Sequence, residues 1–485
     1  MKKHSYKLNI LYNAIYRCVV IVTPLITSPY LSRVLGAEKL GVYSYANAFA
    51  TYFVIFSLLG VSDYGNRTVA QVRGDRDRLS DAFWQIYYLQ FFLTILLLAA
   101  YAVSIFSAAR YFTVQLVFGL YVLSSFFEVN WFAFGMEEFR LTSIRSIITR
   151  LGIVVCIFLF VKGPEDVWKY ALITQLGNIA SQAVILPLVF RNTDFRKPDI
   201  KAIVRHFKPN LILFLPVIAS SVYQQLSKLM LGAWSTEAEV GFFQNAENIV
   251  TLPTFITTAI VTVMLPYASN LIARGDGDEN RQLLYSTLKY TSVLNVAMAF
   301  GMFAIAKDFI PWYLGESFSR SASLVMILAP MIFFNGFSSI IRYQHLIPNE
   351  MDRANLASMF GGAAVDILAS LLLIPLQGAA GAAWATVIAY CATLLIQLLY
   401  AGKQLELMLI FRSFAPTVLF GALMLGIVRL ISRLALSPVL LILLELAAGA
   451  AVYLICTVTW MEKTGDHIFS SMFTAFRKKH AGGSD

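Results

Sequence analysis

Residues 211–232 read LILFLPVIASSVYQQLSKLMLG, an apolar run that nevertheless contains Lys228 near its end. Runs of similar length and character recur along the whole chain, so this stretch decides the fold class. A lysine at the centre of a bilayer costs about 2.5–3.5 kcal/mol on insertion scales. The stretch therefore predicts a membrane span and raises the question of what keeps a cation in it.

The composition of the chain excludes an ordinary soluble domain. Of its 485 residues, 58% are apolar and 14% are charged, whereas a soluble domain carries about 25% charged residues. A helix that crosses about 30 Å of hydrocarbon needs roughly 20 mostly apolar residues, and on this template the sequence predicts an all-α polytopic membrane protein with about 14 transmembrane helices. The predicted spans are residues 10–31, 41–61, 82–107, 111–134, 146–161, 167–190, 209–232, 241–268, 286–306, 320–341, 355–375, 380–400, 413–432 and 438–460.

The basic residues predict the orientation of these spans. With both termini in the cytoplasm, most of the 38 lysines and arginines fall in inward-facing loops and tails, as the positive-inside rule requires. The richest inward loop is 191–208, and the basic tail contains RKKH at 477–480. The net charge of +10 thus indicates contact with anionic lipid and not with nucleic acid.

An internal repeat links the run around Lys228 to the start of the chain. Residues 31–46 read LSRVLGAEKLGVYSYA and residues 226–246 read LSKLMLGAWSTEAEVGFFQNA. At a constant offset of 200, the residues Gly41, Tyr43 and Ala46 match Gly241, Phe243 and Ala246. Arg33 then corresponds to Lys228. The two copies lie six spans apart and so have the same orientation, as in transporters built from parallel repeats.

The repeat predicts the domain organisation. We expect two pseudo-symmetric six-helix lobes, an N-lobe at 1–207 and a C-lobe at 208–400. The remaining residues, 401–485, would form two extra spans and the basic cytosolic tail.

Some basic residues of the predicted spans share a helix face with polar side chains. Ser221, either Gln224 or Gln225, and Lys228 are spaced to lie on one face of an α-helix. Such a face usually points toward the interior of a helix bundle or a water-filled cavity. Arg17 lies in a similar stripe of the first span, and Arg150 lies in another span. The alternative for Lys228 and Arg33, which lie near the outward ends of their spans, is snorkelling to the interface.

Three acidic residues are candidates for ion coupling or for ion pairing. Glu247 follows the same outward loop as Lys228 and is expected to pair with it. Glu128 and Arg150 are expected at the inward ends of adjacent spans, where they would form a second ion pair. Asp366 falls near mid-membrane, where it would either carry H⁺ or Na⁺ or cap the backbone of a neighbouring helix.

Several absences limit the chemistry. The sequence contains no nucleotide-binding G-x-x-x-x-G-K-[ST] loop, no His/Cys cluster at metal spacing and no arguable nucleophilic triad. We therefore predict a transporter without cofactor or metal, not an enzyme. A membrane glycan polymerase is disfavoured because its chemistry needs a long outward loop. Pro24 and Pro216 predict kinks in the first span of each lobe.

Longer blocks of the sequence carry a resemblance to a known family. They are residues 9–48 (NILYNAIYRCVVIVTPLITSPYLSRVLGAEKLGVYSYANA), 59–70 (LGVSDYGNRTVA), 208–232 (KPNLILFLPVIASSVYQQLSKLMLG), 245–249 (NAENI), 263–270 (VMLPYASN) and 373–386 (LIPLQGAAGAAWAT). In family order, these blocks resemble the oligosaccharide (repeat-unit) flippase family for O-antigen and capsule. That family belongs to the multidrug/oligosaccharidyl-lipid/polysaccharide exporter superfamily.

The resemblance implies a two-lobe, V-shaped transporter in the bacterial plasma (inner) membrane. It would move undecaprenyl-diphosphate-linked oligosaccharide repeat units from the inner to the outer leaflet for surface polysaccharide biosynthesis, with polysaccharide polymerase and assembly proteins as possible partners. Alternatives are a lipid II flippase and a multidrug exporter of the same superfamily.

The resemblance also bears on single positions. Lys228 matches the basic member of a family Asp-Lys pair, but Ser227 stands in place of the acid. Asp366 stands where the family more often has Asn. The family's Y-G-N-R block, for which a gate or hinge role is expected, consists here of Tyr64, Gly65, Asn66 and Arg67.

The mechanism expected from the residues is alternating access with a cationic central cavity. Its candidate lining residues are Arg17, Arg33, Lys228, Arg150 and Gln224. One pair of unit charges at 4 Å gains about 4 kcal/mol at an effective dielectric constant of 20. A few such contacts would offset much of the desolvation of a lipid diphosphate.

Overall fold

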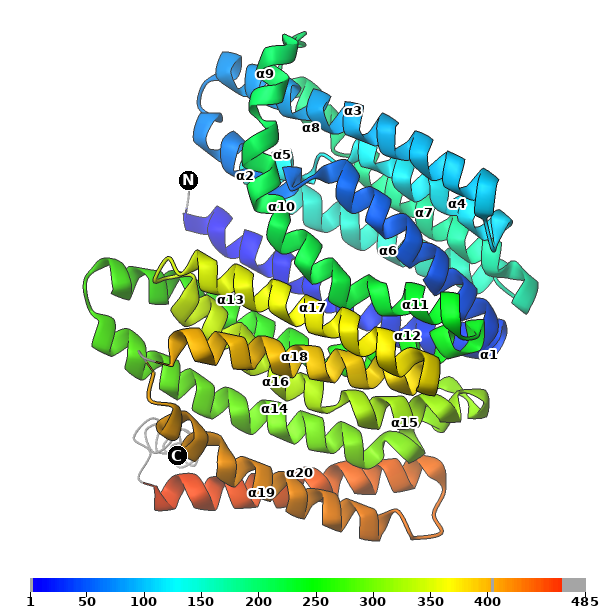
Figure 1. Cartoon of the computed structure of the whole chain (residues 1–485), viewed down its shortest axis with the longest axis vertical. Helices are drawn as coiled ribbons and strands as arrows, with labels where there is room; N and C mark the ends of the chain where they lie inside the picture. The colour runs from blue at the N-terminus through cyan, green and yellow to red at the C-terminus, as the bar shows by residue number, and fades with distance from the viewer. Residues whose placement is uncertain (1–2, 403–404, 465–485) are drawn as a thin grey trace, which may run out of the picture. The chain divides into compact units, whose positions relative to one another are not determined.

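Every regular element in the described residues, 3–402 and 405–464 of the computed structural model, is a helix (Figure 1). The side chains of residues 3–14, 17, 407, 410 and 413 are outside the description. By their contacts the helices form two units, a first unit of 1–245, 314–320 and 362–389, and a second unit of 246–313, 321–361 and 390–485. The division into lobes after residues 207 and 400 stays a prediction.

The first unit contains the N-terminal helices. They are α1 (Lys3–Leu58), α2 (Val61–Val72), α3 (Arg76–Ala108), α4 (Phe112–Ser124), α5 (Asn130–Gly135), α6 (Phe139–Phe160), α7 (Val167–Ala183), α8 (Leu186–Asn192), α9 (Ile200–Arg205), α10 (Phe207–Ser221) and α11 (Ser227–Trp234). It also holds the start of α12 (Glu237–Thr251), the end of α17 (Asp352–Gln377) and the start of α18 (Ala379–Ala401).

The second unit contains the rest of α12, α17 and α18 and the following helices: α13 (Thr254–Ala273), α14 (Gly277–Leu314), most of α15 (Ser319–Leu328), α16 (Pro330–Ile341), α19 (Leu407–Ile431) and α20 (Pro438–Lys463). Three short 3₁₀ turns lie in the first unit: η1 (Ser125–Phe127), η2 (Pro164–Asp166) and η4 (Glu316–Phe318).

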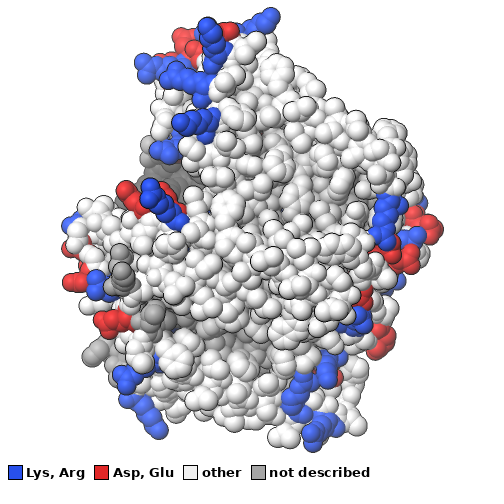
Figure 2. Space-filling model, viewed as in Figure 1, with Lys and Arg blue, Asp and Glu red and all other residues white. Residues whose placement is uncertain are grey.

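The helices have the length and composition of membrane spans. Within the described residues, 12 are long and apolar enough to cross a membrane, or up to 13 if the bent pair Glu316–Leu328 and Pro330–Leu346 is one span. On the face shown in Figure 2, charged side chains gather near the helix ends of Figure 1, and the middle of this face carries none. The predicted all-α polytopic fold is confirmed, whereas the count of 14 is not. One of these segments, Cys18–Val72, combines most of α1 with α2 and overlaps the first two predicted spans.

The long helix α1 bends at a glycine. Gly36 has φ 73° and ψ 172°, which is the only non-helical backbone within α1. A positive φ favours glycine because it has no Cβ. Pro24 and Pro29 lie inside the same helix with helical backbone. The non-helical residue of α1 is therefore Gly36, and Pro216 lies inside α10. The kinks expected at Pro24 and Pro216 stay predictions.

Candidate functional site

Lys228 is buried by protein. Only 6% of its surface is exposed, whereas its repeat counterpart Arg33 is exposed and donates from Nη1 to the carbonyl oxygen of Pro29 at 3.0 Å. Snorkelling requires a side chain that can reach the interface. The burial therefore favours the interior interpretation for Lys228, and the exposure favours snorkelling for Arg33.

A π-helix, η3 (Val222–Leu226), directly precedes the turn that carries Lys228. Each π-type turn closes i→i+5 hydrogen bonds and shifts the register of the residues that follow. As a result Gln224 is exposed while Ser221 and Lys228 are buried. The predicted stripe assumed α-helical spacing, and the structure separates Gln224 from the other two, whereas the alternative member Gln225 is half-buried.

A second π-helix, η5 (Arg342–Leu346), lies in the second unit and also contains a Tyr-Gln pair. Its Gln344 and His345 are buried. π-Helices are rare and occur frequently at functional positions. The two π-helices therefore mark candidate functional turns that no hydropathy pattern could have indicated.

Asp366 lies on a buried polar face in the first unit. It is 1% exposed near the middle of α17, and Ser370, one turn later, is also buried. The Tyr52 hydroxyl donates to the Ser221 carbonyl oxygen at 3.4 Å, and Asp366 is within electrostatic reach of Tyr52. The structure thus brings α1, the end of α10 and the acidic residue of α17 together.

A polar network surrounds Glu128. Its Oε2 accepts from Gln182 Nε2 at 2.7 Å and its Oε1 from the Asn130 backbone N–H at 3.1 Å. Arg145 donates to Asn130 Oδ1 at 2.6 Å and also to the Ser181 carbonyl oxygen.

The arginine near Glu128 is therefore Arg145, and the predicted pairing with Arg150 is wrong. The two arginines lie five residues apart on α6, so at about 3.6 residues per turn they point in different directions. Arg145 is buried, whereas Arg150 is half-buried.

We expect Arg145→Met to destabilise the protein far more than Arg150→Met. Removing one partner from a buried charged network costs about 3–5 kcal/mol, whereas an average substitution costs about 1 kcal/mol. Thermal unfolding of the two purified variants in the same detergent checks this. Equal losses of Tm would show that the Glu128 network does not stabilise the fold.

The start of α12 is anchored by two glutamates that the sequence did not single out. Glu237 accepts from Arg110 Nη2 at 2.9 Å and from the Tyr111 hydroxyl. Glu239 pairs with Arg320 and accepts from the backbone N–H of Ala379 at 2.8 Å. These side chains fix the loop between Lys228 and Gly241 to neighbouring loops of the first unit.

The repeated glycines make a reciprocal contact in the first unit. A Cβ on Gly41 would lie 1.7 Å from the Glu237 carbonyl oxygen, and a Cβ on Gly241 would lie 2.0 Å from the Ala37 carbonyl oxygen. The partners also differ by 200 in number. Such a contact is what a two-fold repeat of α1 and α12 predicts.

The Y-G-N-R block lies in α2 and is tied to the segment between α9 and α10. The Tyr64 hydroxyl is hydrogen-bonded to His206 Nδ1 at 2.8 Å, and His206 Nε2 to Gln85 Oε1 at 2.8 Å. Because an amide oxygen can only accept, Nε2 carries the hydrogen and Nδ1 accepts from Tyr64. His206 had no role in the sequence-based prediction.

Within the same block, Gly65 permits close helix packing. A Cβ there would lie 2.4 Å from the Trp131 ring of α5. Asn66 is half-buried and Arg67 is exposed. The bend itself lies just before the block, at Gly60 with φ 78°. The gate or hinge role of these residues stays a prediction.

For the remaining predicted residues, assembly with Lys228 stays a prediction. Glu247 is half-buried in α12 and belongs to the second unit, so its pairing with Lys228 stays a prediction. Arg17 lies in α1, with a side chain outside the described residues. Within the described residues, no group of three or more His, Cys, Asp or Glu side chains could hold a metal ion.

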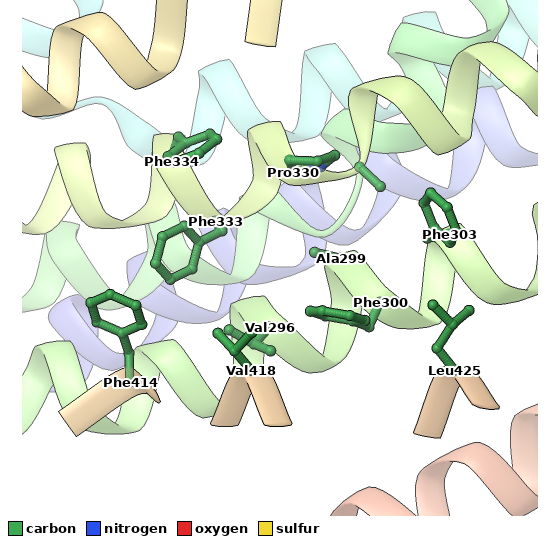
Figure 3. A pocket seen from close by; sticks show the side chains of 11 residues that line it. Val296, Ala299, Phe300, Phe303, Pro330, Phe333, Phe334, Phe414, Val418 and Leu425 are labelled. Carbon is green, nitrogen blue, oxygen red and sulfur yellow. The ribbon is translucent and has the colours of Figure 1, made fainter. Parts of the chain in front are cut away.

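An apolar cavity of about 350 Å³ lies in the second unit, where α14, α16 and α19 meet (Figure 3). Phe300, Phe333 and Phe414 are among its lining side chains, all of which are apolar. Such a lining can hold hydrocarbon, but it offers no donor to a sugar or a diphosphate. Polar recognition must therefore lie elsewhere.

Two candidate O-antigen transporters are similar in sequence to the chain. The protein of Escherichia coli (strain K12) is 21% identical over 379 residues, 77% of the chain and 90% of the relative. The protein of Shigella dysenteriae is 22% identical over 416 residues, 84% of the chain and 100% of the relative.

Two solved structures show the fold. The lipid II flippase MurJ in its inward closed conformation has a TM-score of 0.78 at 16% identity, covering 94% of this chain and 99% of MurJ. An inward-facing multidrug resistance MATE family transporter of the MOP superfamily has a TM-score of 0.59 at 12% identity, covering 80% of this chain and 98% of that transporter.

The model of the family described as polysaccharide biosynthesis protein matches residues 7–272, more than half of the chain. The chain, with its helical transporter fold and buried Lys228, therefore belongs to the polysaccharide biosynthesis protein family.

Proposed function

We propose that the protein is a flippase for undecaprenyl-diphosphate-linked oligosaccharide repeat units. The observation that carries the proposal is the buried Lys228, in a chain whose family serves polysaccharide biosynthesis and whose relatives are described as candidate O-antigen transporters. A buried lysine is rarely kept in a span without a role. A diphosphate is the anionic group of such a substrate.

The transporter must move the charged diphosphate across the membrane interior, a region of low dielectric constant. A lysine ammonium is a compact point charge with three rotatable donors, suited to phosphate oxygens. Each contact at 4 Å would contribute about 4 kcal/mol at an effective dielectric constant of 20. Arg17 and Arg150 are further candidates along the path, with the glycan passing through the expected central cavity and the prenyl tail remaining in lipid.

Coupling to an ion gradient is a separate part of the proposal. Asp366 would bind H⁺ or Na⁺, because it is a buried ionisable residue near the middle of a span, and such residues commonly mark ion pathways. Glu247 and Glu128 are secondary candidates. Transport would take place in the bacterial plasma membrane with both termini in the cytoplasm, in line with the predicted charge distribution of the loops. Polymerase and assembly proteins would act on the exported repeat units.

The test is deletion and complementation in the source organism. Loss of the protein is expected to abolish surface polysaccharide and to accumulate lipid-linked repeat units on the cytoplasmic side of the membrane. Restored viability on depletion of a lipid II flippase would instead assign lipid II as the substrate. Increased drug sensitivity with unchanged surface polysaccharide would assign a multidrug exporter.

A further inference from the structure

A second cavity of the second unit combines an apolar wall with one carboxylate. It measures about 390 Å³ and lies between α14, α19 and α20. Met298, Met424 and Leu446 are typical of its lining, and Glu445 is its one acidic lining residue. Volumes of about 300–1,000 Å³ with few polar groups are typical of small-molecule sites.

Glu445 is unusually placed for a carboxylate. It is 0% exposed, and neither of its carboxylate oxygens has a hydrogen-bond partner within the described residues. Burying an unsatisfied polar group costs several kcal/mol, and about 20 or more for an isolated ion in a medium of low dielectric constant. The carboxyl group of Asp308 is near enough to act on Glu445. Two ionised carboxylates repel each other and have no hydrogen to share, so a cation beside Glu445 would stabilise the pair.

The neighbouring charges leave one negative charge uncompensated. Asp308 of α14 and Arg429 of α19 are the charged groups that act on Glu445. Arg429 is directed toward Phe303, with Nη2 3.5 Å from the Phe303 carbonyl oxygen and the guanidinium 6.0 Å from the ring centre. Two carboxylates thus face one arginine that is engaged elsewhere. A monovalent cation would complete the balance of charge.

The chemistry of the residues that line the cavity decides which kind of cation fits. A hard metal ion takes six or more oxygen ligands, and the apolar lining of this cavity does not provide them. Methionine side chains are polarisable and adapt to irregular hydrocarbon ligands. The lining residue Leu454 is also exposed, so the cavity reaches the surface of the unit.

We propose that this cavity binds an amphipathic organic cation, an ammonium group on a hydrocarbon body, with Glu445 as its counter-ion. The carboxylate would accept the ammonium hydrogens, and the hydrocarbon would lie along α14 and α20. The proposal does not depend on the nature of the transported glycan. The ammonium could belong to an aminophospholipid or to a soluble amphipathic amine, which share this chemistry.

The test is native mass spectrometry of the full-length purified protein with dodecylamine, and with dodecanol as the uncharged probe of equal length. Wild-type protein is expected to prefer the amine at least tenfold. Glu445→Gln keeps the side-chain volume and should abolish the preference. Glu462→Gln, at an exposed glutamate of the same helix, is the matched control and should retain it.

Equal binding of amine and alcohol by wild-type protein would overturn the proposal, a result that requires no variant to fold. Equal amine preference in wild type and Glu445→Gln would also overturn it. The source of the ammonium is identified by competition in nanodiscs. Displacement of dodecylamine by phosphatidylethanolamine but not by phosphatidylglycerol would support the lipid source, and displacement by neither would support a soluble amine.

Discussion

Replacing Lys228 by methionine is expected to reduce export of surface polysaccharide at least tenfold at matched protein level. The substitution removes a buried cation while keeping an unbranched apolar side chain in the space. Loss of a single charge contact of about 1.4 kcal/mol already corresponds to a factor of ten, and the proposed contact with a diphosphate is stronger. Lys228→Arg keeps the charge and should retain part of the export.

The repeat supplies the matched control for this experiment. Arg33→Met removes a cation at the equivalent position, but that guanidinium is exposed and bonded to its own helix. Its effect should stay below about 1 kcal/mol, which is typical of exposed charges. Export and Tm are measured together, because a purely structural role of Lys228 would lower both. Full export by a stably folded Lys228→Met protein would exclude this cation from the mechanism.

The second large effect is expected at the contact between the two repeated glycines. Gly41→Ala and Gly241→Ala would each place a Cβ about 2 Å from a backbone carbonyl oxygen, which cannot move without separating α1 and α12. Overpacking typically costs about 1–3 kcal/mol, and backbone atoms on both sides place these variants at the upper end. We expect a fall in Tm of several degrees and a parallel fall in export.

Two other helical glycines provide controls. A Cβ on Gly152 of α6 or on Gly426 of α19 would meet nothing within 4 Å. Alanine is favoured over glycine in a helix by about 1 kcal/mol, so these variants should hold or gain stability. Because Gly41 and Gly241 share one contact, the double variant should lose less than the sum of the single variants. Identical Tm values for Gly241→Ala and Gly152→Ala would refute the close approach.

The sequence predicted the fold class but not the local geometry of the candidate site. Hydropathy is a property of residue type, so it indicated the helices and the unusual position of Lys228 directly. The predicted stripe through Gln224 was lost because a π-helix changes the number of residues per turn. Glu128 was paired with the wrong arginine because sequence distance does not give the direction in which a helical residue points.

The sequence-based prediction also missed two other residues, of which one had a recognisable signal in the sequence. Glu445 is a single carboxylate in a long apolar run, the same signal that singled out Asp366. His206 precedes a span in a basic loop and resembles its neighbours in sequence. Its hydrogen bonds to Tyr64 and Gln85 join residues more than 100 positions apart and could not be read from local pattern.

The sequence by itself determined that the chain is helical, that it is a membrane protein and that Lys228 and Asp366 lie in apolar helices, because the cost of exposing polar groups to hydrocarbon depends on composition along the chain. It also revealed the repeat with its glycines. Only the tertiary structure decided that Lys228 is covered while Arg33 is not, that Gly41 and Gly241 meet, and that Glu445 borders a cavity. Burial and contact depend on which helices pack against one another. These helices are often far apart in the sequence, so a local sequence pattern cannot predict their contacts.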